Sequence, residues 1–170
     1  AFAGNSKLST VYLSISLVTI ENEAFEGCAN LTSVTLGKNI TNIGEQVFFS
    51  DTALSNVYYL GDIESWCNTV FASNSSNPMM YADAFYLLDN NEEYQEVIDL
   101  VIPASVISIG DYQFYGFAHL ENVLFTPNLA EIGNKSFYGC TNLNNLYFSG
   151  ALADWCNISF VDNYSTDRKS

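Results

Sequence analysis

The side chains that most often carry catalysis are scarce in this chain. His119 is the one histidine in 170 residues, so a Ser/His/Asp or Cys/His set would have to be built on it. It lies just before a predicted strand, and the sequence spacing places no candidate catalytic partner beside it. We therefore expect His119 to be a surface residue, and we expect the chain not to be an enzyme.

The cysteines offer a second kind of chemistry. They are Cys28, Cys67, Cys140 and Cys156, and no two are spaced as C-x-x-C, the usual signature of a zinc site. We expect four buried thiols that pack as small hydrophobic side chains. Disulfides from Cys28 to Cys67, or from Cys140 to Cys156, remain an alternative.

Carboxylates gather around one predicted turn, at Asp89, Glu92, Glu93 and Glu96. Calcium needs six to eight oxygen ligands in a compact loop, and the chain contains no D-x-D-x-D-G phrase. A glycosidase-type carboxylate pair would have to lie on turns and rims, where no two copies share a position. We therefore expect a solvated turn, with no metal and no cofactor.

Composition limits the partners that the chain can have. Asp and Glu number 19 against 5 Lys and Arg, which gives a formal net charge of −14. This charge argues against binding to nucleic acid or to an anionic membrane surface. Apolar residues make up 48% of the chain, which is too many for disorder. No apolar stretch is long enough for a transmembrane helix and no signal peptide is recognised, so we expect no membrane insertion.

The elements that position these residues repeat with a period of 23. Four apolar columns recur in five copies. They are Phe2, Phe25, Phe48, Phe114 and Phe137; Leu8, Leu31, Leu54, Leu120 and Leu143; Val11, Val34, Val57, Val123 and Leu146; and Leu13, Leu36, Tyr59, Phe125 and Phe148. One such repeat cannot bury its own apolar face, so the pattern predicts a stacked solenoid. In each copy L-x-x-V-x-L predicts a short strand, I-x-x-x-A-F a second inward-facing edge, and Asn and Gly the turns.

These repeats resemble the BspA-like leucine-rich repeats, also called the Treponema pallidum type, with the consensus I-G-x-x-A-F-x-x-C-x-x-L-x-x-V-x-I-P. The matching residues are Ile20, Ala24, Phe25, Cys28, Leu31, Val34 and Leu36, and again Ile132, Gly133, Phe137, Cys140 and Leu143. Asp51 and Phe117 stand where Cys is usual, and Gly37 stands where Pro is usual. The resemblance implies a β-rich (α+β) right-handed coil with short strands on one face, and an extracellular or cell-surface location.

An inserted module interrupts the array, which we treat as one unit over residues 1–170. We expect regular repeats at 1–59 and 102–148, an insert at 60–101 and the start of a second insert at 149–170. We also expect the chain to be cut from a longer array, without a terminal cap.

The first insert is predicted to contain a helix and a hairpin. Ile63, Trp66, Cys67 and Val70 fall on one face of a short helix whose N-cap is Asp62. The hairpin that follows is expected to turn at 89–93. Residues 150–165 repeat the W-C-N phrase of the first insert, where Leu152, Trp155 and Cys156 take the same helical spacing.

The outward positions of the predicted strands form the candidate binding surface. They are Tyr12, Thr35, Asn56, Tyr58, Asn122, Leu124, Asn145 and Tyr147. Tyrosine gives a large rigid contact area and is enriched at interfaces, although it also suits a strand through cross-strand packing. We expect an adhesin-like module that binds a protein or glycan on a host or microbial surface. The alternative is a structural spacer or display array of a larger extracellular protein whose active domain lies elsewhere.

Overall fold

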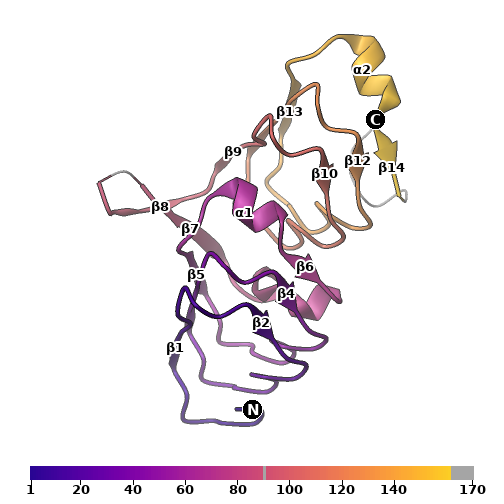
Figure 1. Ribbon diagram of the computed structural model, residues 1–170. Coiled ribbons are helices and arrows are strands. Elements are labelled where there is room, and N and C mark those ends of the chain that lie inside the picture. Colours follow the sequence, from indigo (N-terminus) through magenta and orange to yellow (C-terminus); the bar gives the residue numbers. More distant parts are fainter. Residues whose placement is uncertain (90, 162–170) are drawn as a thin grey trace.

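The chain folds into two short coils joined end to end, with a hairpin that projects beside the joint (Figure 1). The computed structural model describes residues 1–89 and 91–161. Each coil has two sheets of short, mostly parallel strands, one sheet along each of two sides. This arrangement confirms the prediction of a β-rich repeat solenoid.

The first coil holds sheets A and B. Sheet A runs in the order β1 (Thr10–Tyr12), β3 (Ser33–Leu36), β5 (Asn56–Tyr59), β7 (Ala84–Leu88) and β8 (Tyr94–Glu96). Sheet B consists of β2 (Thr19–Ile20), β4 (Asn42–Ile43) and β6 (Val70–Phe71). In the second coil, sheet C consists of β9 (Asp99–Val101), β11 (Asn122–Phe125) and β13 (Asn145–Phe148). Sheet D consists of β10 (Ser108–Ile109), β12 (Glu131–Ile132) and β14 (Ser159–Phe160).

Register explains why the apolar columns become a core. Val11 pairs with Val34, and Val34 pairs with Val57, so each residue of these strands lies beside the residue 23 positions further along the chain. Identical positions of successive repeats are therefore stacked on the inside of the coil. Leu31 and Val34, from an internal repeat, are fully buried, as the stacking of one repeat on the next requires.

The phenylalanine column lines the side of the coil that carries no strand. The rings of Phe2, Phe25 and Phe48 are stacked, with centroids 5.7 and 5.8 Å apart. Phe114 and Phe137 stack in the same way at 5.1 Å. Backbone groups of this side also pair from turn to turn, because the Phe2 amide donates to the Ala24 carbonyl at 2.7 Å and Phe25 donates onward at 3.1 Å. Backbone hydrogen bonds thus join successive turns on the irregular side of the coil as well.

Two backbone positions of each repeat have a left-handed φ, one on either side of the phenylalanine. The position after the ring holds Gly4, Gly27, Ser50, Gly116 and Gly139, with φ between 65° and 81°. The position before it holds Glu23, Gln46, Tyr112 and Lys135, with φ between 52° and 58°. Glycine therefore occupies left-handed positions in the turns as expected. Asparagine instead stabilises the turns through side-chain hydrogen bonds. The Asn30 amide, for example, donates to the Ser6 carbonyl at 2.6 Å.

The insert adds one longer turn to the first coil rather than leaving it. Asn56 pairs with Ala84, an offset of 28, and the extra residues form helix α1 (Ile63–Cys67). Asp62 caps this helix as predicted, accepting from the Ser65 amide at 2.8 Å. The helix ends at Cys67, so the prediction that Val70 lies on its face is wrong. Val70 belongs to β6, and its side chain is 61% exposed.

The second insert begins in the same way. Helix α2 (Leu152–Asn157) precedes β14, and Ile132 pairs with Phe160 at the same offset of 28. Leu152 is exposed there, in contrast to Ile63. The last part of this predicted insert, 162–170, lies outside the described residues. No helix in the described part of the chain has the length and apolar character needed to cross a membrane.

The rest of the first insert contains two 3-10 helices and the expected hairpin. The 3-10 helices are Asn74–Ser76 and Pro78–Met80. Strands β7 and β8 pair antiparallel, and the Asp89 amide donates to the Glu93 carbonyl at 2.8 Å across the turn. The regular register resumes at Asp99, which pairs with Asn122, so it begins a few residues earlier than the expected Ile102.

Side chains of the insert connect the two coils. The Trp66 indole is fully buried and donates to the Gln113 carbonyl at 2.9 Å, while the Gln113 amide donates back to the Trp66 carbonyl. Asn77 donates to the Tyr112 carbonyl at 2.8 Å. The Trp66 ring also packs on Phe85 at 4.7 Å. The cores of the two coils are consequently one continuous cluster.

Candidate binding surface

A row of side chains crosses the outer side of sheet A. Residues that pair directly in neighbouring strands project on the same side of a sheet. The pairing places Tyr12 beside Thr35, Thr35 beside Tyr58 and Tyr58 beside Tyr86. Tyr86 then lies opposite Glu96 of β8. Three tyrosines and a carboxylate thus share one row across five strands.

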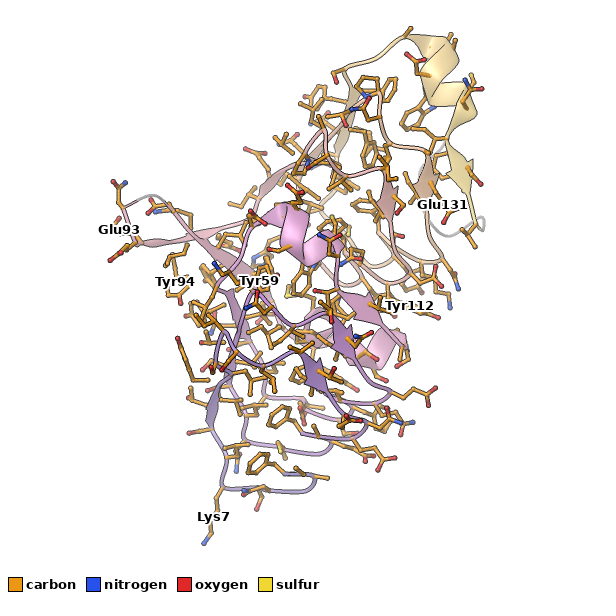
Figure 2. All side chains as sticks on the ribbon, viewed as in Figure 1. Lys7, Tyr59, Glu93, Tyr94, Tyr112 and Glu131 are labelled. Atoms are coloured by element: carbon orange, nitrogen blue, oxygen red, sulfur yellow. The ribbon has the colours of Figure 1, made fainter. Side chains whose placement is uncertain are left out.

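A fourth tyrosine joins this row from the hairpin. The Tyr94 ring meets the Tyr58 ring edge-on, with centroids 4.7 Å apart, and the Tyr86 ring stacks on Tyr58 at 5.0 Å. We call Tyr12, Tyr58, Tyr86 and Tyr94 the tyrosine patch. Tyr12 is 67% exposed and Tyr94 is 39% exposed, so the patch presents ring surface to solvent. Figure 2 shows Glu93 near the tip of the hairpin, with the Tyr94 label between it and the strands of the first coil.

Two phenols of the patch, those of Tyr86 and Tyr94, resist ionisation. Desolvation raises the pKa of Tyr86, and the nearby charge of Glu96 raises it further. Desolvation also raises the pKa of Tyr94, helped by Tyr12 and Tyr58. Because a free tyrosine ionises only near pH 10, the Tyr86 and Tyr94 phenols keep their protons at physiological pH. The patch therefore offers electron-rich ring faces to a partner, and neutral hydroxyls at Tyr86 and Tyr94.

One contact extends this surface to the second coil. His119 Nδ1 lies 2.6 Å from Glu96 Oε1, and both side chains are partly exposed. The surface location expected for His119 is confirmed, but its sequence neighbourhood did not suggest a partner. The two residues are 23 positions apart, so the partner lies in the same column of the preceding turn.

The eight predicted surface residues lie on two separate sheets of the structure. Sheet A carries Tyr12, Thr35, Asn56 and Tyr58, and sheet C carries Asn122, Leu124, Asn145 and Tyr147. The face is divided because β8 runs antiparallel to β7 and ends sheet A. Thr35 is only 9% exposed between its tyrosine neighbours, and Asn56 is half-buried with its amide on Ser55 Oγ.

On the outer side of sheet C, polar side chains hydrogen-bond one another. The Asn122 amide donates to Asp99 at 2.5 Å, and the Asn145 amide donates to Asn122 at 2.8 Å. These amides satisfy one another along the sheet, which leaves them less free to bind a partner. Tyr147 is 54% exposed and lies beside Leu124. Sheet C thus carries one exposed tyrosine, where sheet A carries a cluster.

Sequence reasoning missed two members of the patch, Tyr86 and Tyr94. Tyr86 was hidden because the longer turn shifts it 28 positions from Tyr58 instead of 23. Matching A-F-Y-L to N-V-Y-Y would have aligned the two tyrosines. Tyr94 lies opposite Leu88 in the hairpin, and it could have been placed only by fixing the register of the antiparallel pair.

The cysteines, all within the described residues, are free thiols, so the alternative disulfide pairings are wrong. Cys28 and Cys140 each donate a thiol hydrogen bond, 3.2 Å long, to the carbonyl of the phenylalanine in the preceding turn. This shared contact explains why cysteine recurs in that column. Cys67 and Cys140 are partly buried and Cys156 is exposed, so the expectation of four buried thiols holds for Cys28 alone.

The carboxylates of the hairpin shape its turn. Asp89 accepts from the amides of Asn91 and Glu93, at 2.8 and 2.9 Å. These backbone hydrogen bonds lower the pKa of Asp89, because they favour the charged form. Within 1–89 and 91–161, no group of three or more His, Cys, Asp or Glu side chains is arranged to hold a metal ion.

Three solved leucine-rich repeat proteins are similar to this chain. The T. pallidum Leucine Rich Repeat protein is 25% identical, with a TM-score of 0.46, over 86% of this chain and 59% of that chain. A leucine rich cell surface protein from Faecalibacterium prausnitzii A2-165 is 17% identical, with a TM-score of 0.43, over 93% and 64%. A leucine-rich repeat protein from Bacteroides ovatus ATCC 8483 is 17% identical, with a TM-score of 0.36, over 90% and 44%. The chain therefore spans less than two thirds of the length of each.

The family model that matches the chain describes the BspA type leucine rich repeat region. Six copies of it cover residues 1–78 and 81–168, which is nearly the whole sequence. No curated protein matches the chain. The columns, the turns and the cysteine contact described above are the structural counterparts of this repeat. The chain belongs to the BspA type leucine-rich repeat family.

Proposed function

We propose that this chain is a non-enzymatic interaction module that binds another protein through the tyrosine patch, in secreted form or on a cell surface. The family supports a repeat module for protein interaction. From this family membership we further propose an adhesin-like role and a secreted or cell-surface location.

The observation that carries the proposal is the concentration of partly exposed tyrosines on sheet A. Four rings from four strands form one surface, in which Tyr58 contacts both Tyr86 and Tyr94. Rings held by neighbouring rings lose little conformational entropy when a partner covers them. Clusters of this kind are where the binding energy of an interface concentrates.

A comparison of two variants tests the proposal. The chain is screened against a panel of purified secreted and cell-surface proteins, and any partner is titrated against Tyr12→Ala/Tyr94→Ala and Tyr147→Ala. We expect about a tenfold or greater loss of affinity for the double variant and almost none for Tyr147→Ala, which removes an exposed tyrosine from sheet C.

The outcome also separates the module from a spacer. Binding that survives loss of Tyr12 and Tyr94 would show that sheet A is not the binding surface. A panel without a single partner would favour the spacer interpretation. Thermal unfolding of each variant confirms that a lost interaction is not a lost fold.

A further inference from the structure

Positive charge is missing from the whole middle of this chain. No lysine or arginine lies between Lys38 and Lys135, whereas thirteen aspartates and glutamates do. His119 is the one basic side chain of this stretch, and it already contacts Glu96. In Figure 2, Lys7 lies at the N-terminal end of the first coil, away from the hairpin that carries Glu93.

Three of the four rings of the tyrosine patch, Tyr58, Tyr86 and Tyr94, lie within this stretch. Glu96 pairs directly opposite Tyr86 on the same side of sheet A. Glu93 immediately precedes Tyr94, and Glu92 and Glu93 are both exposed on the hairpin. The hairpin that carries Tyr94 therefore also carries Glu92, Glu93 and Glu96, and of these Glu96 contacts His119.

Aromatic rings and carboxylates in this arrangement favour one kind of ligand. A lysine or arginine side chain is attracted to the face of a tyrosine ring, and its attraction grows where negative charge lies near by. An arginine can also stack its planar guanidinium on a ring while it bonds a carboxylate. We infer that the tyrosine patch and the hairpin carboxylates bind a basic segment of a partner protein, with Arg or Lys side chains over Tyr94 and Tyr58.

This inference rests on the proposed function and names the partner's chemistry. A second copy of the chain fits poorly, because two molecules that each carry a net charge of −14 repel one another. A neutral glycan could cover the rings and donate hydroxyl hydrogen bonds to the carboxylates, but it would gain nothing from their negative charge. Charge therefore favours a basic protein segment, and the acidic field would speed its approach.

Synthetic peptides provide the probe. Fluorescent (Gly-Arg)4, (Gly-Lys)4 and (Gly-Glu)4 are titrated with the chain by fluorescence anisotropy, at about 0.05 and 0.3 M salt. We expect binding in the order Arg, then Lys, with none for Glu, and weaker binding at the higher salt. Chitin and maltose oligosaccharides serve as the uncharged comparison.

Matched variants separate a specific site from general attraction to an acidic protein. Tyr94→Phe keeps the ring, whereas Tyr94→Leu keeps apolar area without it, so we expect a two- to fivefold loss only for the leucine variant. Glu93→Gln should weaken binding and flatten the salt dependence. The controls Tyr147→Leu and Glu131→Gln alter exposed residues of the second coil. They should change neither the affinity for the basic peptides nor its salt dependence.

Two results would overturn the inference. Equal affinities for Tyr94→Phe and Tyr94→Leu would show that the ring face is not used. Equal losses for Glu93→Gln and Glu131→Gln would show that any carboxylate suffices. If the basic peptides fail while a partner from the panel still depends on Tyr12 and Tyr94, the inference is wrong and the proposed function stands.

Discussion

Asp51 is a buried carboxylate in the column that holds cysteine in other repeats. Its Oδ1 accepts from the Cys28 amide at 2.7 Å, and its Oδ2 has no hydrogen-bond partner among the described residues. Burial raises the pKa of Asp51 from 3.8 to about 7, although the Cys28 amide opposes the shift, and the charge of Glu26 adds to it. The side chain is fully excluded from solvent, so the charged form is costly.

The cost of this charge depends on pH. Between pH 4 and 7 the folded protein keeps a proton that the unfolded chain has released, so the free energy of unfolding falls as the pH rises. Below pH 4 both states are protonated and the charge has no effect. Above pH 7 both states are ionised. The difference between a pKa of 3.8 and one of about 7 corresponds to about 4 kcal/mol, which relaxation around the charge reduces to about 2–4 kcal/mol.

Replacing Asp51 by cysteine should remove this cost. The new thiol would stand where Cys28 and Cys140 donate to a carbonyl of the preceding turn, and Cys28 would keep its backbone bond to Phe25. We expect Asp51→Cys to raise the free energy of unfolding by about 2–4 kcal/mol at pH 8, with a much smaller gain at pH 4. Asp51→Asn removes the charge without adding a thiol and should show the same loss of pH dependence.

Urea unfolding at a series of pH values, with reductant present, measures these differences. Asp111→Asn is the matched control, because Asp111 also accepts a backbone amide hydrogen bond from a neighbouring turn but is exposed. Its effect should not grow between pH 4 and 8 as that of Asp51 does. If wild type and Asp51→Cys lose stability in parallel over this range, the reasoning about a buried charge is refuted.

Two further predictions concern the backbone turns and the thiols. Gly116 and Gly139 share a left-handed φ, but a Cβ on Gly116 would lie 2.1 Å from the Met79 carbonyl oxygen. In urea unfolding, Gly116→Ala should therefore destabilise the fold by about 3 kcal/mol or more, and Gly139→Ala by only about 1–2 kcal/mol. Equal losses would show that the joint between the coils yields to the new methyl group. The Cys156 thiol is exposed, whereas burial is the main cause that raises the pKa of the Cys67 thiol to about 12. A thiol reagent at pH 8 should therefore label Cys156 in the folded protein and Cys67 only after unfolding.

The repeat pattern was sufficient to predict most of the fold. A column such as Val11, Val34 and Val57 specifies both the period and the inward side of the strand, because one repeat cannot bury that residue alone. The cap at Asp62 and the turn at 89–93 followed from local sequence, since caps and turns are determined by a few neighbouring residues.

The candidate surface depended on contacts that local patterns do not encode. Tyr94 reaches Tyr58 only because an antiparallel strand returns along the edge of sheet A. Thr35 was expected to be exposed, but its two tyrosine neighbours cover it. The joint between the two coils depends on Trp66 and Gln113, which are 47 positions apart and belong to different turns.

That joint also determines how the molecule would carry a load. Within each coil, backbone ladders on two sides share a pull along the axis among many hydrogen bonds. Those ladders end at the joint, where sheets A and B are not continued by sheets C and D, and the buried Trp66, Asn77 and Gln113 contacts take their place. A family member stretched between two attachment points would therefore behave as stiff rods connected by a softer coupling. The coupling would open first, and it would lengthen the molecule while both coils stay folded.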